Sequence, residues 1–324
     1  MDGTTVLLAL TGIALLGIGG DVLVRGAVGV AELLKVSPLF TGLVLVGFGT
    51  STPELATSLD AVLQGSPEIA VGNVLGSNIA NILLILGLTA LVLPIPAERQ
   101  AFRRDAPMLA LATLSFVAVA LLGGVGRASG LLFVALLIGY LVFVFRTESR
   151  RHDASAELHT LEAGLLRSPH RRAGVSVALA VGGLAGVLLG ADLLVKSSIA
   201  IATVLGIPET VIGLTIVAVG TSLPELATSL VAALKRQTDI ALGNIIGSNI
   251  FNILGILGVS ALVFPFEIPR ALLVYDVWVL LAVTALLLGF ALTNARITRV
   301  EGVVFLLLYA SYLLFLGARA AGWL

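Results

Sequence analysis

The chain alternates between long apolar stretches and short polar ones. A bilayer core about 30 Å thick requires roughly 20 apolar residues per spanning helix. Ten segments come close to that length, and we expect each of them to be a transmembrane helix. The sequence therefore predicts an all-α, polytopic membrane protein, with spans at residues 4–30, 39–63, 69–93, 106–124, 130–146, 174–202, 210–234, 240–264, 271–292 and 301–318.

One long polar stretch divides these segments into two groups of five. It runs from residue 146 to residue 172 and holds all three histidines of the chain. We interpret it as a solvated linker with room for a short surface helix. The predicted organisation is a five-helix unit over residues 1–145, the linker over 146–172, and a second five-helix unit over 173–324.

The two groups are copies of each other. Residues 42–60 (GLVLVGFGTSTPELATSLD) align without gaps to residues 213–231 (GLTIVAVGTSLPELATSLV), with 13 of 19 positions identical. Residues 69–88 (IAVGNVLGSNIANILLILGL) align to residues 240–259 (IALGNIIGSNIFNILGILGV), with 14 of 20 identical. Because five spans per copy is an odd number, the second copy enters the membrane upside down, which predicts an inverted repeat.

The composition supports a membrane protein and excludes several functions. The chain is 58% hydrophobic and 12% charged, whereas a soluble domain carries about 25% charged residues on its water-facing surface. Its formal net charge is zero, so no basic excess points to nucleic acid. Cysteine is absent, which excludes disulfides and thiolate metal sites. We expect the lipid bilayer as its surroundings, and no cofactor, nucleic-acid partner or obligate protein partner.

The distribution of Lys and Arg predicts the orientation of the chain. With the N-terminus outside, the inner connections hold 14 of these residues and the outer ones hold 3. Positive charge favours the cytoplasmic side. We therefore expect a multi-pass protein of the plasma membrane, with both termini outside and the linker in the cytoplasm.

Two carboxylates lie in the middle of apolar spans. Glu54 and Glu225 each belong to a GTSxPEL motif, and a carboxylate at that depth is costly unless it faces a cavity or a partner. Pro53 and Pro224 lack an amide hydrogen and clash with the preceding turn, so each helix should break near its Gly-Thr-Ser triplet. Backbone freed in this way must line a cavity or bind a ligand.

The donors around these breaks are all oxygens. Carboxylates, hydroxyls and backbone carbonyls suit hard cations such as Ca²⁺ and Na⁺ better than Zn²⁺ or Cu²⁺. A second repeated motif, GNxxGSNIxNI, adds Ser and Asn four positions apart on one helix face. We interpret its other amides, Asn73 and Asn78, as interhelical hydrogen-bonding residues. The candidate cation ligands are Glu54, Glu225, Thr50, Thr221, Ser51, Ser222, Ser77, Ser248, Asn81 and Asn252.

A charged pair also recurs at an offset of 171 residues. Asp21 precedes Arg25 by four positions, and Asp192 precedes Lys196 by four. Opposite charges at this spacing pair along one helix. We interpret both as neutralised pairs rather than as gating groups.

The paired motifs resemble the two alpha-repeats of the calcium/cation antiporter superfamily. They are most similar to the sodium/calcium exchanger branch, including its prokaryotic members, over essentially the whole chain. The resemblance implies that Glu54 and Glu225 bind transported Ca²⁺ together with the carbonyls of Thr50 and Thr221. It also implies that the long first and sixth helices slide to alternate access, and that flanking Na⁺ sites are formed by Ser51, Ser77, Ser222, Ser248, Asn81 and Asn252.

The coupling ion is predicted by comparison with branches of that superfamily. Positions 81 and 252 are both Asn, as in exchangers that need no potassium. Proton-driven members typically carry GNxxE, where this chain has GNVLG and GNIIG. We expect Na⁺/Ca²⁺ antiport, with H⁺/Ca²⁺ exchange as the alternative.

Two other functional classes fit the sequence less well. An intramembrane hydrolase could use two carboxylates as an acid/base dyad, but such a dyad needs no repeated Thr, Ser and Asn donors. A passive channel could line a pore with Glu. An inverted repeat with broken helices at mid-membrane is instead typical of alternating access.

Overall fold

The computed structural model describes the chain except for residues 1–2, 97–98, 160–172, 206–217, 295 and 321–324. It confirms an all-helical, polytopic membrane protein. Within the described ranges, eight helical spans are long and apolar enough to cross a bilayer, and a bent pair over residues 38–63 makes nine. Part of the span expected at 210–234 lies outside the described residues.

The first half of the chain contains continuous and segmented spans. The second and third spans are assembled from consecutive short helices that include π-helical turns, a feature often associated with functional sites. The elements are α1 (Gly3–Leu34), α2 (Pro38–Thr41), η1 (Gly42–Gly47), α3 (Phe48–Thr50), α4 (Thr52–Leu63), α5 (Pro67–Ala80), η2 (Asn81–Ile85), α6 (Leu86–Val92), α7 (Arg99–Leu121) and α8 (Arg127–His159).

Where it is described, the second half repeats this order of elements, except that two helices stand where the first half has α7. Two short antiparallel strand pairs also tie the halves together, because β1 pairs with β4 and β2 pairs with β3. The helices are α9 (Ala173–Val204), α11 (Ala218–Gly220), α12 (Leu223–Leu234), α13 (Thr238–Ile250), η4 (Phe251–Leu257), α14 (Gly258–Val263), α15 (Arg270–Val274), α16 (Asp276–Asn294) and α17 (Arg299–Ala320). The strands are β1 (Ile95–Pro96), β2 (Gly124–Val125), β3 (Phe266–Glu267) and β4 (Arg296–Ile297).

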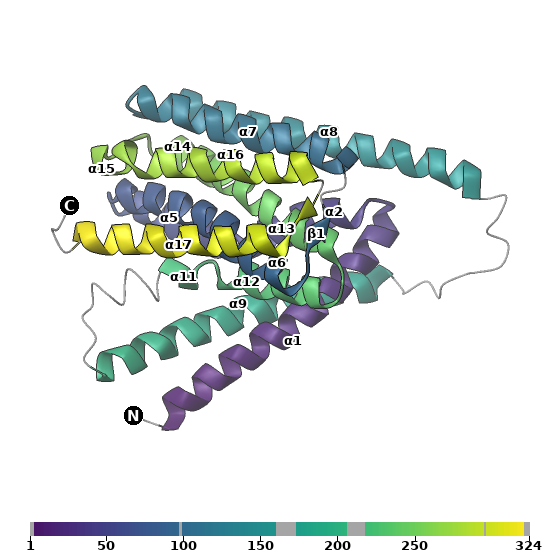
Figure 1. The fold of residues 1–324 in the computed structure, drawn as a ribbon, viewed down its shortest axis with the longest axis horizontal. Helices are drawn as coiled ribbons and strands as arrows, with labels where there is room; N and C mark the ends of the chain where they lie inside the picture. Colours follow the sequence, from purple (N-terminus) through teal and green to yellow (C-terminus); the bar gives the residue numbers. More distant parts are fainter. Residues whose placement is uncertain (1–2, 97–98, 160–172, 206–217, 295, 321–324) are drawn as a thin grey trace.

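The two long helices α1 and α9 lie side by side along one edge of the molecule (Figure 1). They run antiparallel, with Gly12 near Gly190 and Gly26 near Ala180. A Cβ on Gly26 would lie 2.2 Å from the backbone nitrogen of Ala180, so the two backbones touch. Small residues allow this close approach, which drives helix association in lipid.

The spans that carry the second repeated motif form the centre of the molecule. Most of the α5–α6 segment and of the α13–α14 segment is buried, unlike the outer helices. Gly243 and Gly247 let α13 approach η1, because a Cβ on Gly247 would lie 2.2 Å from the carbonyl oxygen of Leu43. The motif of one half therefore packs directly against the segment that precedes the GTSxPEL motif of the other.

The structure differs from our expectation that a solvated linker begins at residue 146. The helix α8 continues to His159, because no Gly or Pro interrupts the chain between Tyr140 and that residue. Glu148, expected in solvent, is buried, pairs with Arg104 and accepts a hydrogen bond from the Ser37 amide at 2.9 Å. The remainder of the expected linker lies outside the described residues.

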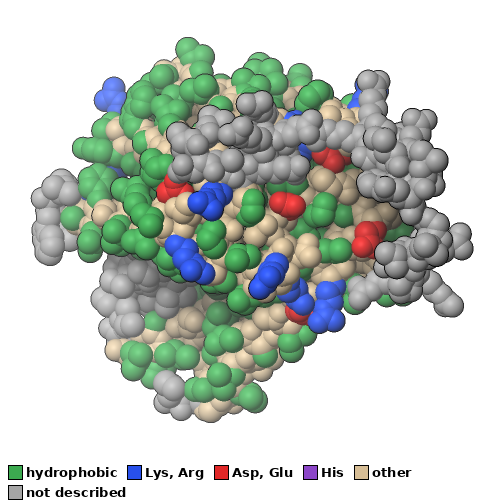
Figure 2. Space-filling view, turned by 45° about the vertical axis from the view of Figure 1, so that its right-hand side comes forward, with side chains coloured by type: hydrophobic (Ala, Val, Ile, Leu, Met, Phe, Trp, Pro, Cys, Tyr) green, Lys and Arg blue, Asp and Glu red, His purple; other side chains and the backbone are tan. Residues whose placement is uncertain are grey.

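The surface combines an apolar belt with a charged end. Figure 2 looks obliquely at the end where α1 ends and α17 begins, and it shows Lys, Arg, Asp and Glu side chains gathered among hydrophobic ones. Large apolar side chains are exposed on the outer helices, including Leu7, Ile18, Leu131 and Leu314. This distribution suits a protein whose middle is surrounded by lipid tails and whose charged end faces the polar surface of the bilayer.

Two adjacent glycines of α9 provide a matched test of the α1–α9 contact. A Cβ on Gly183 would lie 2.2 Å from the backbone nitrogen of Leu23, whereas Gly182 has no described atom within 4 Å of that position. Gly183→Ala should lower the unfolding free energy by about 1–3 kcal/mol through overpacking. Gly182→Ala should be neutral or stabilising by up to about 1 kcal/mol, because alanine favours helix. Thermal unfolding of the detergent-purified variants measures both effects, and equal losses would contradict the backbone contact.

Candidate cation site

Both GTSxPEL motifs break their helices where the prolines predict. The segment over residues 38–50 meets the one over 52–63 at an angle of 42°. The residues at the breaks have similar backbone angles, with φ −80° and ψ 9° at Ser51 and φ −89° and ψ 5° at Ser222. Glu54 and Glu225 therefore lie in the first turns of α4 and α12, where the positive end of the helix dipole stabilises a carboxylate.

The two carboxylates are buried and sparsely hydrogen-bonded. Each of the glutamates is only 1% exposed. The Ser51 hydroxyl donates to Glu225 Oε1 at 2.9 Å, which brings the break of the first half to the carboxylate of the second. Among the described residues, Glu225 Oε2 and both Glu54 oxygens have no hydrogen-bond partner.

Three more contacts join the two halves at this point. Thr50 Oγ1 lies 3.0 Å from the Val46 carbonyl and 3.2 Å from Asn244 Oδ1. The Ser248 hydroxyl donates to the Gly47 carbonyl at 3.1 Å. Asn252 Nδ2 donates to Asn78 Oδ1 at 3.1 Å. Each contact links the broken helix or the asparagine motif of the first half to the asparagine motif of the second, so both halves contribute to the site.

The buried polar atoms that lack partners concentrate at this junction. Leaving such an atom unpaired costs about 1–3 kcal/mol, so a fold that keeps several of them together indicates a ligand site. Asn252 is informative because its amide nitrogen is held by Asn78 while its oxygen stays unpaired. Within the described residues the unpaired atoms include Glu54 Oε1 and Oε2, Glu225 Oε2, Ser222 Oγ, Asn81 Oδ1 and Nδ2, Asn252 Oδ1, Asn249 Oδ1 and Asn78 Nδ2.

The remaining candidate residues lie at the edge of the same region. Ser77 is buried in α5, four residues before Asn81. Thr221 is half-buried and lines a cavity of about 170 Å³ between α9 and the two breaks. That cavity also contacts both prolines, and Asp192 belongs to its α9 wall. The structure thus brings all ten candidates to the two broken helices and the helices packed on them.

Two asparagines hold the glutamate turns in place, whereas the sequence indicated interhelical hydrogen bonding for Asn73 and assigned no such role to Asn244. Asn73 Nδ2 donates to the Glu54 carbonyl at 3.2 Å and to Ser58 Oγ at 3.0 Å. Asn244 Nδ2 makes the equivalent bonds to the Glu225 carbonyl at 3.2 Å and to Ser229 at 2.8 Å. The serine of the repeated ATS triplet, identical in both motifs, was the signal that could have revealed this support.

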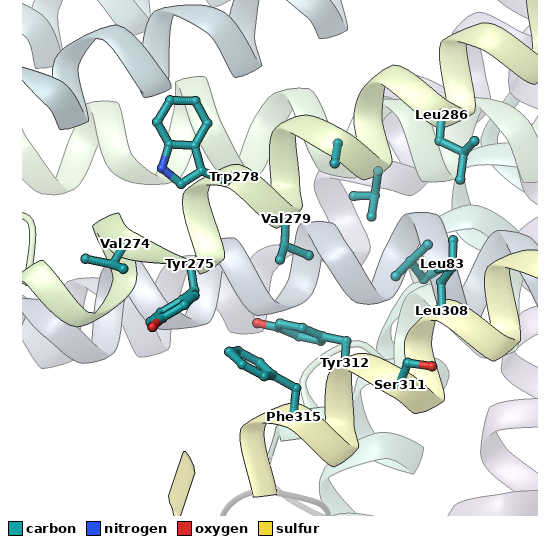
Figure 3. Close-up of a pocket in the computed structure, with 12 residues that line it drawn as sticks. Leu83, Val274, Tyr275, Trp278, Val279, Leu286, Leu308, Ser311, Tyr312 and Phe315 are labelled. Atoms are coloured by element: carbon teal, nitrogen blue, oxygen red, sulfur yellow. The ribbon is translucent and has the colours of Figure 1, made fainter. Parts of the chain in front are cut away.

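A larger hollow elsewhere is unsuited to a cation. It has a volume of about 570 Å³ and lies between α16 and α17 (Figure 3). Its lining is apolar and aromatic, including Trp278, Tyr275, Tyr312 and Phe315, and contains no Asp or Glu. Its composition matches the lipid-facing surface around it, so the junction of the broken helices remains the candidate site.

The chemistry of that junction is that of a hard-cation site with modest charge. The described residues contain no group of three or more His, Cys, Asp or Glu able to hold a metal ion. Two carboxylates and several neutral oxygens instead form the donor set, which suits Ca²⁺ or Na⁺. A site that binds without an excess of charge also permits release, as ion conduction and transport require.

Comparison with known proteins agrees with this chemistry. The profile of the family described as "Sodium/calcium exchanger protein" matches residues 4–146 and 175–318, which is one match in each half. The chain belongs to the sodium/calcium exchanger family. It is therefore a transporter of the antiporter type rather than an enzyme.

Similar proteins match along nearly their full length. The exchanger is 41% identical to the putative antiporter CaxA of Alkalimonas amylolytica, over 94% of this chain and 95% of that protein. It is 36% identical to the sodium/calcium exchanger MaX1 of Methanosarcina acetivorans, over 96% and 97% of the two chains. The sodium-calcium exchanger NCX_Mj, solved after soaking with Na⁺ and Ca²⁺, superposes with a TM-score of 0.81 at 34% identity, covering 96% of this chain and 97% of that one.

The asparagine supports give the first test of the site. Asn244→Ala leaves the Glu225 carbonyl and Ser229 without this donor in a fully buried position, so it should lower the unfolding free energy by about 1–3 kcal/mol. Asn73→Ala should cost less, because Asn73 is only half-buried. Thermal unfolding in detergent measures the difference. Ser229→Ala is the control, since it keeps the carbonyl bond and should lie between wild type and Asn244→Ala.

Proposed function

We propose that this exchanger moves Ca²⁺ against Na⁺ by alternating access, with Glu54 and Glu225 at the central cation site. The observation that carries the proposal is the convergence of two buried, sparsely bonded carboxylates on two broken helices. Carboxylates at bilayer depth require a compensating partner. A transported cation supplies that compensation only while it is bound, so the site is suited to exchange one cation for others.

Ca²⁺ would bind between the two glutamates. One divalent ion cancels both charges, and the backbone carbonyls of Thr50 and Thr221 would complete its shell. Both threonines lie at helix breaks, and carbonyls at the ends of half-helices are the groups that coordinate cations in broken-helix transporters. The carbonyl at the end of each half-helix supplies negative potential without adding a titratable group.

Na⁺ would bind at sites flanking the glutamates. A hydroxyl that donates one hydrogen bond keeps lone pairs for a cation, as Ser51 and Ser248 do here. Asn81 and Asn252 offer unpaired amide oxygens. The proposed Na⁺ ligands are Ser51, Ser77, Ser222, Ser248, Asn81 and Asn252.

The proposed mechanism requires an inverted architecture. We propose ten transmembrane helices in two inverted five-helix repeats, residues 1–145 and 173–324, joined on the cytoplasmic side by the polar stretch 146–172, into which α8 continues as far as His159. The antiparallel contact of the equivalent helices α1 and α9 supports inversion, as does the pairing of β1 with β4 and of β2 with β3. The excess of Lys and Arg on one side supports termini outside a plasma membrane.

Neutralising either central carboxylate tests the site. Glu54→Gln or Glu225→Gln should abolish Ca²⁺ exchange, because a divalent ion would keep half of its compensating charge in a low-dielectric site. The measurement is Ca²⁺ uptake into proteoliposomes driven by an imposed Na⁺ gradient.

Glu68→Gln is the matched control, since it removes an exposed carboxylate at the start of α5 and should leave uptake near wild type. Gel filtration and thermal unfolding would establish that the inactive variants are folded. Near-normal uptake by both central variants would overturn the assignment of the site.

The charge of the site predicts how transport responds to voltage. With Asn at positions 81 and 252, two glutamates limit the site to two negative charges. One Ca²⁺ neutralises it, and three Na⁺ would leave one positive charge to move. That charge is worth about 2.3 kcal/mol per 100 mV, so Na⁺-driven Ca²⁺ flux should change with membrane potential and should not need K⁺.

The same proteoliposomes distinguish the coupling ions. Two protons would neutralise the carboxylates as Ca²⁺ does, so proton exchange would be electroneutral. Ca²⁺ flux that is driven by a pH gradient, does not depend on Na⁺ and does not change with membrane potential would favour the H⁺/Ca²⁺ alternative.

A further inference from the structure

The outer helices α1 and α9 pack differently around the site, although the motifs of the two halves are copies. We call the α1–α12 contact one side of the site and the region between α9 and α4 the other. On one side α1 packs on α12, and a Cβ on Gly20 would lie 3.1 Å from Val231 Cγ2. The position equivalent to Gly20 in the second half is Ala191, which lines the cavity beside Asp192 instead. The structure is therefore closed between α1 and α12 and hollow along α9.

An ion pair crosses the closed side. Lys235 Nζ contacts Asp21 Oδ1, and Arg25 pairs with the other oxygen of the same carboxylate at 2.8 Å. Lys235 ends the glutamate-bearing helix α12, and Arg236 follows with φ 60°, which turns the chain away. The contact thus connects the outer helix α1 to the helix that carries Glu225.

On the other side the position equivalent to Lys235 carries no cation, so the equivalent ion pair is missing. Position 64, which corresponds to Lys235, is Gln, and its amide donates to Asp60 within α4 at 2.6 Å. Asp192 pairs along its own helix with Lys196 at 2.8 Å. Asp60 also replaces Val231, so closing α9 onto α4 would bring a second carboxylate, rather than a cation, towards Asp192.

We propose that Lys235 is a one-sided latch, which holds α1 on α12 and biases the exchanger towards the conformer with the cavity open beside Asp192. The inference rests on the proposed alternating access, because a bias needs two conformers to act on. An interaction made in one conformer and missing in its counterpart shifts their populations by its differential free energy. Lys235 is thus a positioning residue, which acts through its ion pair with Asp21 rather than on the side chain of either glutamate.

The absence of native cysteine allows a direct test with single reporters. Val24 is buried on the closed side, and Val195 is its equivalent on the α9 wall of the cavity. Val24→Cys should react slowly with a polar maleimide in detergent-purified protein, and Val195→Cys should react readily. Adding Lys235→Gln should speed labelling at position 24 about two- to fivefold, the shift that a partly exposed ion pair supports. Labelling at position 195 should stay unchanged or slow.

Three further variants sharpen the result. Lys235→Arg should restore slow labelling at position 24, and Arg236→Gln, which changes the neighbouring exposed cation, should have no effect. Gln64→Lys gives the other side a cation, so it should slow labelling at position 195 even where Lys235→Gln folds poorly.

Two outcomes would overturn the latch. The first is a rate of labelling at position 24 that Lys235→Gln does not change. The second is faster labelling at both positions in the Lys235→Gln variant, which would indicate general loosening of the structure. Failure of the proposed function is visible separately. If the proposed function is wrong, adding Ca²⁺ or Na⁺ should not change the rate of labelling at position 24 or 195 in any variant. If only the latch is wrong, these ions should still change the labelling rates.

Discussion

Two carboxylates buried at bilayer depth are the constraint on which the rest of the structure depends. Glu54 and Glu225 are each 1% exposed, and ionised groups in such a place need a partner of opposite charge. Their helices are broken by proline, which places each carboxylate at a helix N-terminus and leaves oxygen donors around it. In the proposed function, a bound hard cation compensates both charges and its departure restores the cost, so the site would suit exchange.

The duplication of the chain supplies equivalent supports and unequal surroundings. Asn73 and Asn244 hold the carbonyls of the two glutamates at the same distance of 3.2 Å. In contrast, Ser51 donates to Glu225, while its counterpart Ser222 has no hydrogen-bond partner among the described residues. The local scaffold is thus common to both halves, and the difference between them lies in how the outer helices pack on it.

Close helix packing makes that difference possible. In lipid, helices gain little from burying apolar surface, so their association depends on small residues and polar contacts. The α1–α9 contact uses glycines on both helices, and polar atoms are concentrated at the candidate cation site and at the ends of the spans. Backbone surfaces without long interlocking side chains present few steric obstacles to relative movement of the two outer helices.

The sequence alone determined the membrane environment, the duplicated halves, the helix breaks and the set of oxygen donors, because these follow from run length, repetition and proline. It did not reveal that α8 continues to His159, that Ser51 reaches Glu225, or that Lys235 pairs with Asp21. The polar residues after position 146 indicated a linker, and only the fold shows that Glu148 is buried there against Arg104. The other two contacts join residues far apart in the chain, so only the packing of whole helices decides which side chains meet.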